Sequence, residues 1–261
     1  MTPDWITSDV TAQLYSRVGG FFTNTQRGPG HCRVCTGPAS AELCSKCTAQ
    51  RNEYGSRLAD IVVPLAYAKG HVSPIHQSAH HVIRYKSELQ PSLENLQDLQ
   101  LMINTASRLH GACIAKVVGW WEALTFVPSA SRPGIQHPVV ELAKRVAPSA
   151  SNVDKILLDN GPDISADPIR WPMATRFEIA DKWQKKIAGK HVLVVDDTWV
   201  SGGKSQSAAI ALKDAGAAAV TILCVARWLS QTYGDDHRLM IKEMTAPYDA
   251  TACPVTGVAC P

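Results

Sequence analysis

The chain has 261 residues, 45% of them hydrophobic, and a formal net charge of +3 at pH 7. It is long enough for one full α/β domain with a small appendage, and its charge is too small to indicate nucleic-acid binding by itself. The opening MTPDWITSDV lacks the basic and apolar regions of a secretory signal, and no apolar run reaches the roughly 18 residues of a membrane span. We therefore expect a cytoplasmic protein whose eight cysteines are thiols or metal ligands.

Four cysteines near the N-terminus form two C-x-x-C pairs, Cys32 with Cys35 and Cys44 with Cys47. Two such pairs supply four thiolates for a tetrahedral zinc ion, and four protein ligands leave no position for a catalytic water. The spacing therefore predicts a structural zinc knuckle. Free thiols in a loop or a redox pair are the alternatives, and His31 is a possible spare ligand.

The segment from residue 10 to residue 128 predicts a helix at 10–18, followed by two strands, a second helix and a third strand. Adjacent histidines at 80 and 81 would point to opposite faces of a strand, so they are not expected to share a metal. Met102 and Cys113 are interpreted as core residues. The predicted elements are strands at 60–68, 78–86 and 120–128 and a helix at 93–109.

Two loops follow that could meet a ligand. Residues 130–137 form a small polar loop before a helix predicted at 138–147, and such a loop suits an anion or is a plain connection. After a short strand at 155–159, prolines rule out a long regular element over 160–176. This long loop is either a lid or an exposed hairpin or insertion. Its candidates for contacting a ligand are Arg170, Trp171 and Arg176.

The most informative stretch runs from Lys190 to Arg227. An apolar strand at 191–195 ends on two acids, a small polar turn follows, and a helix at 205–215 ends at Gly216. A second apolar strand occupies 220–225. The order predicts a right-handed βαβ unit with a parallel pair of strands.

The turn between this strand and helix predicts a binding site. A glycine-rich turn at a helix N-terminus offers backbone N–H groups to a phosphate. Asp196 and Asp197 could hold ribose hydroxyls or a magnesium ion, so the strand end fits a ribose 5-phosphate. Gly203-Lys204-Ser205 also looks like the end of a Walker A loop, but Thr198 stands where that loop needs its first glycine. An ordinary α/β crossover is the other alternative.

These residues resemble the signature of the type I phosphoribosyltransferases: an apolar strand, two acids, and a loop of hydroxyl residues and glycine. The strand, both acids, Ser201 and Gly202 match, whereas Val200 and Lys204 stand at positions that are usually hydroxyl residues. The resemblance implies an α/β fold with a mainly parallel twisted sheet flanked by helices. It implies that the two acids bind the ribose and that the 5-phosphate is held by Thr198, Val200, Ser201, Gly202, Gly203, Lys204 and Ser205.

Four cysteines ahead of this signature resemble the layout of the ComF family. The resemblance implies a zinc-binding segment over 1–55, with its knuckle at about 30–50, a phosphoribosyltransferase-like domain over 56–230 and a polar C-terminal tail over 231–261. It also implies that Lys86, Arg132 and Arg176 face the pyrophosphate of the substrate. The family's pyrophosphate loop carries several arginines, whereas this loop keeps only Arg132.

The resemblance implies an enzyme that binds magnesium and phosphoribosyl pyrophosphate and transfers the phosphoribosyl group to a nitrogen acceptor. The alternatives are a non-catalytic phosphoribosyl- or nucleotide-binding module, a module that handles single-stranded DNA during DNA uptake, and a relative that has lost ligand binding. Cys253 and Cys260 could share a metal or pair with each other, but the sequence does not place any partners for them.

Overall fold

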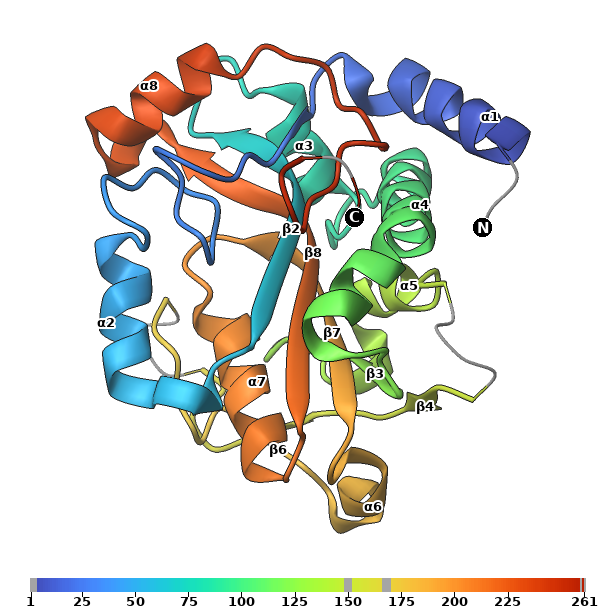
Figure 1. The fold of residues 1–261 in the computed structure, drawn as a ribbon, viewed down its shortest axis with the longest axis vertical. Coiled ribbons are helices and arrows are strands. Elements are labelled where there is room, and N and C mark those ends of the chain that lie inside the picture. Colours follow the sequence, from blue (N-terminus) through green and yellow to red (C-terminus); the bar gives the residue numbers. More distant parts are fainter. Residues whose placement is uncertain (1–3, 148–151, 166–169, 259, 261) are drawn as a thin grey trace.

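The computed structural model describes residues 4–147, 152–165, 170–258 and 260. Its main sheet has six strands in the order β1-β2-β8-β7-β3-β4; β1 is antiparallel to β2, and the other neighbours are parallel (Figure 1). The predicted α/β class, with a mainly parallel sheet flanked by helices, is confirmed. In sheet order these strands are β1 (Thr23–Asn24), β2 (Ile61–Gly70), β8 (Ala219–Ser230), β7 (His191–Trp199), β3 (Ala123–Phe126) and β4 (Asp154–Lys155).

The remaining elements of the described residues are a two-stranded hairpin, eight α-helices and five short 3₁₀ or π helices. The hairpin pairs β5 (Asp159–Asn160) with β6 (Phe177–Glu178). None of the helices formed by the described residues is both long and apolar enough to cross a membrane. The helices are α1 (Asp4–Leu14), α2 (Ser45–Tyr54), α3 (Gln77–Arg84), α4 (Leu93–Val118), α5 (Val139–Ala143), α6 (Gln184–Ile187), α7 (Gly203–Asp214) and α8 (Asp235–Glu243).

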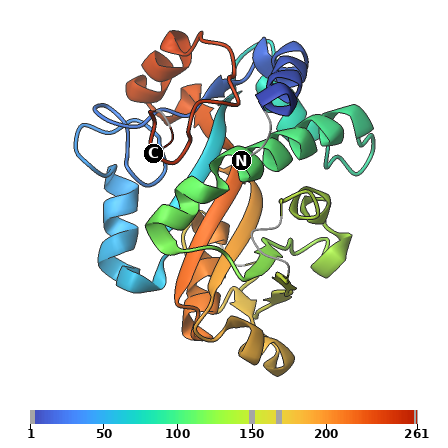
Figure 2. The same ribbon diagram turned by 45° about the vertical axis from the view of Figure 1, so that its right-hand side comes forward.

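The sheet has a hydrophobic core on each face because successive side chains of its central strands point to opposite sides. In β7, Leu193 and Val195 pack into the core that contains α4 and α5, and Val192 and Val194 pack into the core that contains α7. All four are fully buried. Burial on both faces explains why this strand reads as a continuous apolar run, and Figure 2 shows α4 lying across one face of the sheet.

The predicted βαβ unit is confirmed as β7-α7-β8, with His191 opposite Ala219 in a parallel ladder. Gly216 follows the helix with a φ of 89°, as expected of a residue that ends it. Both strands extend further than the apolar runs indicate. The ladder continues to Trp199 opposite Arg227, so the two acids lie within β7 and not after it.

The strand predicted at 78–86 is wrong, because residues 77–84 form helix α3. Ala79 and Val82 are buried three positions apart, which is a helical spacing. The His76 side chain caps the helix by accepting a hydrogen bond from the backbone N–H of Ser78 at 3.3 Å. A histidine cap is not among the usual start signals, which explains the error.

The C-terminal residues form more than a polar tail. After α8, the chain runs back across the sheet end toward α4 (Figure 1). Tyr248 and Ala250 are buried in the core that contains α4, and Cys253 is also buried. The Asn24 side chain of β1 donates to the carbonyl of Asp249 at 2.8 Å, so the C-terminal segment contacts the edge strand of the sheet.

Candidate functional site

A cavity of about 400 Å³ opens at the carboxyl ends of β2, β8 and β7, where ligands of parallel sheets bind. The strands meet this edge in parallel, as Figure 1 shows. Both predicted acids and every residue predicted for the 5-phosphate line the cavity. With Lys86, these are Asp196, Asp197, Thr198, Val200, Ser201, Gly202, Gly203, Lys204 and Ser205.

The loop between β7 and α7 has the conformation of an anion-binding turn. Gly202 adopts a left-handed conformation with φ 80°, and the helix starts at the next residue. A Cβ atom at this position would lie 2.2 Å from Cζ2 of Trp199, so the loop requires glycine both for its φ and for its packing. The first N–H groups of α7 have no carbonyl partner within the helix and adjoin the cavity.

Thr198 places a polar group in the cavity wall without a protein partner. Its Oγ1 atom is buried and makes no hydrogen bond to the described residues. A buried hydroxyl without a partner costs free energy, and a ligand that accepts or donates a hydrogen bond there would recover it.

The first acid, Asp196, is held by its neighbours in the loop. Its Oδ2 accepts a hydrogen bond from Ser205 Oγ at 2.5 Å, and its Oδ1 accepts from the backbone N–H of Asp197 at 2.8 Å. Burial and the adjacent charge of Asp197 raise the pKa of Asp196 to about 7. Asp196 can therefore gain or lose a proton near neutral pH.

The second acid, Asp197, is ion-paired. Lys86 Nζ lies 2.6 Å from its Oδ2, and the Tyr85 hydroxyl donates to the same oxygen. Burial, the largest single effect, would raise the pKa of Asp197, but the Lys86 charge and the hydrogen bonds from Lys86 and Tyr85 together outweigh it and hold that pKa below its usual value. The two acids thus differ in protonation, one fixed as a carboxylate and one poised to titrate.

The structure separates the three residues predicted to face pyrophosphate. Lys86 lines the cavity, but Arg132 and Arg176 are not among its lining residues. Arg132 Nε lies 3.8 Å from Glu88 Oε1. Arg176 is fully buried and donates from Nη2 to Met173 Sδ at 2.9 Å.

Of the two other lid candidates, Arg170 reaches the site. It lines the cavity, and its guanidinium lies 5.5 Å from the centre of the Tyr233 ring. Trp171 instead donates from Nε1 to Glu53 on α2 at 2.9 Å. Arg170 is therefore a cation of the long loop that faces the cavity.

Sequence reasoning missed the histidine and aromatic side chains of the cavity wall, which are His71, His137, Trp228 and Tyr233. Burial lowers the pKa of His137 to about 4, so its ring is neutral at pH 7. His71 follows β2, and Trp228 and Tyr233 lie near the end of β8. His71, Trp228 and Tyr233 could have been found from this position, because the carboxyl ends of parallel strands meet at one edge of the sheet.

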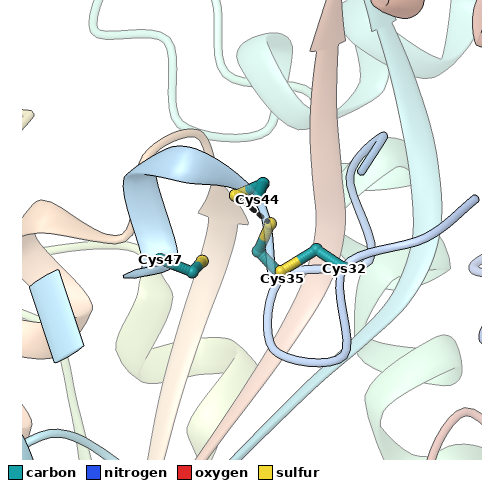
Figure 3. Close-up of side chains that lie close together, drawn as sticks. All are labelled: Cys32, Cys35, Cys44 and Cys47. Atoms are coloured by element: carbon teal, nitrogen blue, oxygen red, sulfur yellow. Dashed lines mark hydrogen bonds between the residues drawn. The ribbon is translucent and has the colours of Figure 1, made fainter. Parts of the chain in front are cut away.

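The four N-terminal cysteines form one cluster (Figure 3). The sulfur atoms of Cys32, Cys35, Cys44 and Cys47 lie within 4.8 Å of one another, and those of Cys35 and Cys44 are 3.8 Å apart. Sulfurs around a tetrahedral zinc are separated by about 3.8 Å, given Zn–S bonds of about 2.3 Å. The cluster could therefore hold a metal ion such as zinc. His31 is not a member of this cluster; its Nδ1 lies 3.0 Å from the carbonyl of Pro29.

The cysteine cluster is connected to the loop between β7 and α7, which is predicted to hold the 5-phosphate and is called the phosphate loop for that prediction. Gln50 of α2, the helix that carries Cys47, donates from Nε2 to the carbonyl of Ser201 at 3.1 Å. Arg227 at the end of β8 donates from Nη1 to the carbonyl of Val200 at 2.7 Å. These bonds fix the carbonyls of the loop on the side of the cysteine cluster.

No protein-family model matches this chain, and no curated protein matches it. Solved structures with similarity include a phosphoribosyltransferase from Corynebacterium diphtheriae, at 17% identity and a TM-score of 0.30, covering 51% of this chain and 78% of that one. A hypoxanthine phosphoribosyltransferase from Staphylococcus aureus has 13% identity and a TM-score of 0.32, covering 57% of this chain and 88% of its own. A second crystal form of that enzyme gives 12% identity and the same TM-score. At these TM-scores the similarity carries no argument about activity, which rests on the geometry of the site.

Proposed function

We propose that the chain binds phosphoribosyl pyrophosphate and transfers its phosphoribosyl group to a nitrogen acceptor, with release of pyrophosphate. One observation carries the proposal: the left-handed Gly202 turn at the start of α7 and the carboxylates of Asp196 and Asp197 line a single cavity. A ribose 5-phosphate presents an anion and a diol close together, which is the pair of groups that this wall would bind.

The phosphate would lie at the turn, where it accepts hydrogen bonds from the N–H groups of Gly203, Lys204 and Ser205. The Lys204 ammonium adds a charge-assisted contact. The ribose hydroxyls would donate to Asp196 and Asp197, whose carboxylate oxygens accept more than one hydrogen bond each.

The carboxylates fit ribose hydroxyls better than a directly coordinated magnesium ion. Asp197 is already neutralised by Lys86 at 2.6 Å, and an ammonium at this distance repels a divalent cation. Magnesium, which binds substrate phosphates readily, would supply charge neutralisation of the pyrophosphate. Asp196 is the one acid of the pair with no basic partner within the described residues, so it fits a water-mediated contact to that ion.

In the reaction the bond from C1′ to the pyrophosphate oxygen breaks and a bond from C1′ to the acceptor nitrogen forms. The bonding electrons leave with pyrophosphate, and the proton of the acceptor nitrogen passes to water. No nucleophilic side chain is required, because positioning and charge stabilisation carry such a transfer. Lys86 and Arg170 are the cations that line the cavity away from the phosphate turn.

We also propose that the four-cysteine cluster holds a structural zinc ion. Its four thiols fill a tetrahedral shell, and Gln50 links the helix of the cluster to the phosphate loop. The ion would stabilise the loop and take no part in the chemistry.

Titration calorimetry of the zinc-replete protein with phosphoribosyl pyrophosphate, with and without magnesium, tests the proposal. We expect binding that strengthens with magnesium and that is lost in the Asp196→Asn/Asp197→Asn double variant. A folded protein that binds no phosphoribosyl pyrophosphate under either condition contradicts the proposal. Where binding is found, pyrophosphate release is measured against a panel of nitrogen acceptors.

A second candidate is a non-catalytic phosphoribosyl-binding module. It is favoured by the position of Arg132 and Arg176, which do not line the cavity, so the pyrophosphate side has fewer cations than predicted. Binding without turnover for any acceptor would identify this case. A module that handles single-stranded DNA is tested by fluorescence anisotropy with a single-stranded oligonucleotide at rising salt concentration, because electrostatic binding to the phosphate backbone weakens steeply with salt.

A further inference from the structure

A second cluster of metal-ligand side chains lies where the C-terminal segment meets α4. His110 and Cys113 belong to α4, and Cys253 and Cys260 belong to the C-terminal segment. One ligand atom from each lies within 4.8 Å of the others, as in the N-terminal cluster. About 150 residues separate the two halves in sequence, and the return of the chain to α4 brings them together (Figure 1).

The imidazole of His110 is oriented as a ligand. Its Nε2 lies 2.9 Å from the carbonyl oxygen of Ala250, which can only accept, so Nε2 carries the hydrogen. Its Nδ1 therefore holds a lone pair and faces the cluster, 3.1 Å from Cys260 Sγ. Metal-bound histidines typically donate their other N–H to a carbonyl or carboxylate in this way.

The backbone of both halves presents the ligands to one point. His110 and Cys113 are three residues apart on α4, so their side chains share a face of the helix. The turn from Cys253 closes with a hydrogen bond from Gly257 N–H to the Cys253 carbonyl at 2.9 Å, and Gly257 has a φ of 74°. The backbone N–H groups of Thr256 and Val255 donate to the Cys253 sulfur, as in loops that stabilise thiolates.

We propose that His110, Cys113, Cys253 and Cys260 form a second structural zinc site. Three thiolates and one imidazole are an established tetrahedral ligand set for zinc, and four protein ligands leave no open position. Three of the four side chains are buried, and Cys260 is exposed. A disulfide would use two of the three sulfurs and leave the third thiol and the oriented imidazole without a function.

The site would fasten the C-terminal segment to the core. Tyr248 and Ala250 of this segment pack against the same core as α4, and Thr23 of β1 donates to the carbonyl of Ala246 at 2.8 Å. The segment between α8 and Cys260 has little regular secondary structure of its own. A metal that joins it to the longest helix would supply stability that backbone pairing does not.

Metal analysis of the purified protein tests the proposal. Mass-spectrometric quantification is expected to find two zinc ions per chain in the wild type and one in the Cys113→Ser/Cys253→Ser variant. The Cys32→Ser/Cys35→Ser variant also keeps one. Cys224 is the matched control: of the eight cysteines, all in described residues, it is the one that belongs to neither cluster, so Cys224→Ala keeps two.

Cobalt substitution identifies the ligands. The Cys32→Ser/Cys35→Ser variant loaded with Co²⁺ would show the visible absorption of a tetrahedral thiolate site, and adding His110→Ala would shift or abolish it.

Because Cys260 is exposed, Cys260→Ser tests the site with little risk to the fold, and its second zinc would be released faster to a chromogenic chelator. A single zinc that the Cys113→Ser/Cys253→Ser variant keeps and the Cys32→Ser/Cys35→Ser variant loses, or a disulfide among Cys113, Cys253 and Cys260 in protein kept free of oxidants, would overturn the proposal.

Discussion

Lys86 Nζ lies 2.6 Å from Asp197 Oδ2, so the second acid of the pair at the end of β7 is ion-paired within the protein. The lysine belongs to the segment after α3 and the aspartate to the strand, so their contact closes one wall of the cavity. Asp196, one residue earlier, has no cationic partner within the described residues and is bound by neutral donors instead. Ligand binding and pH dependence should therefore differ between the two acids.

Replacing Lys86 by methionine is expected to destabilise the fold by about 1–3 kcal/mol near pH 7. Removing one member of a buried pair typically costs 3–5 kcal/mol, and the partial exposure of Lys86 reduces that figure. The pKa of Asp197 is lowered in the folded state, so the stabilisation is present above its unfolded pKa of about 3.9 and is lost as pH falls through the folded value.

Urea unfolding of Lys86→Met and the wild type at pH 7 and below pH 4 measures this effect. The difference in unfolding free energy should shrink at the lower pH. In an Asp197→Asn background the same lysine substitution should cost less than about 0.5 kcal/mol, because a partly exposed ammonium without its carboxylate partner contributes little to stability. Equal costs in both backgrounds would show that the pair is not coupled.

Asp196→Asn is expected to become more stable relative to the wild type as pH rises from about 4 to about 7. Burial and Asp197 raise the pKa of Asp196 to about 7, so the folded state holds a proton that the unfolded state releases at a lower pH. The wild type therefore loses stability across that window, by about 1.4 kcal/mol for each unit of pKa difference, and the variant does not. Unfolding free energies measured at several pH values give the two curves, and parallel curves from pH 4 to 8 would contradict the prediction.

The parts of the fold that the sequence predicted are those encoded locally. The strand, turn and helix of 190–227 are consecutive, and burial on both faces gives β7 and β8 their apolar composition. Residues 78–86 are a short window with few apolar positions, so their periodicity does not separate a strand from a helix. The burial of Ala79 and Val82, three positions apart, is explained by the helix.

The site divides in the same way. Asp196 and the phosphate loop are adjacent in sequence, so the motif found them together. The burial of Arg176 and the meeting of Cys253 with His110 depend on contacts between distant segments, and no local pattern encodes those contacts. Cys113 is buried as expected of a core residue, but it also lies beside the C-terminal thiols, where it is a candidate metal ligand.

Gln50→Ala is expected to weaken binding of phosphoribosyl pyrophosphate about fivefold with little change in stability of the sheet. The substitution removes the hydrogen bond from Gln50 Nε2 to the Ser201 carbonyl, and one such bond contributes about 1 kcal/mol. Asn52→Ala is the matched control, because it removes an amide from an exposed position of the same helix. Calorimetric affinities of the two variants should differ; equal affinities would show that the cysteine cluster does not position the loop.

Gly202→Ala should abolish the binding of phosphoribosyl pyrophosphate and destabilise the protein by about 2–4 kcal/mol. A non-glycine residue in the left-handed conformation costs about 1–2 kcal/mol, and the new Cβ would lie 2.2 Å from the buried ring of Trp199. The loop must shift to relieve that contact, which moves the first N–H groups of α7 away from the cavity.

Gly216→Ala separates the two causes. Gly216 also has a left-handed φ, of 89°, but its added Cβ would lie at an ordinary 3.6 Å from Cα of Ala188 and far from the phosphate loop. This variant should be destabilised only by the cost of a left-handed alanine, about 1–2 kcal/mol, and should bind with the affinity of the wild type. Thermal unfolding and calorimetry on both variants measure the two effects. If both variants bind equally well, the close approach of Gly202 to Trp199 does not shape the phosphate site.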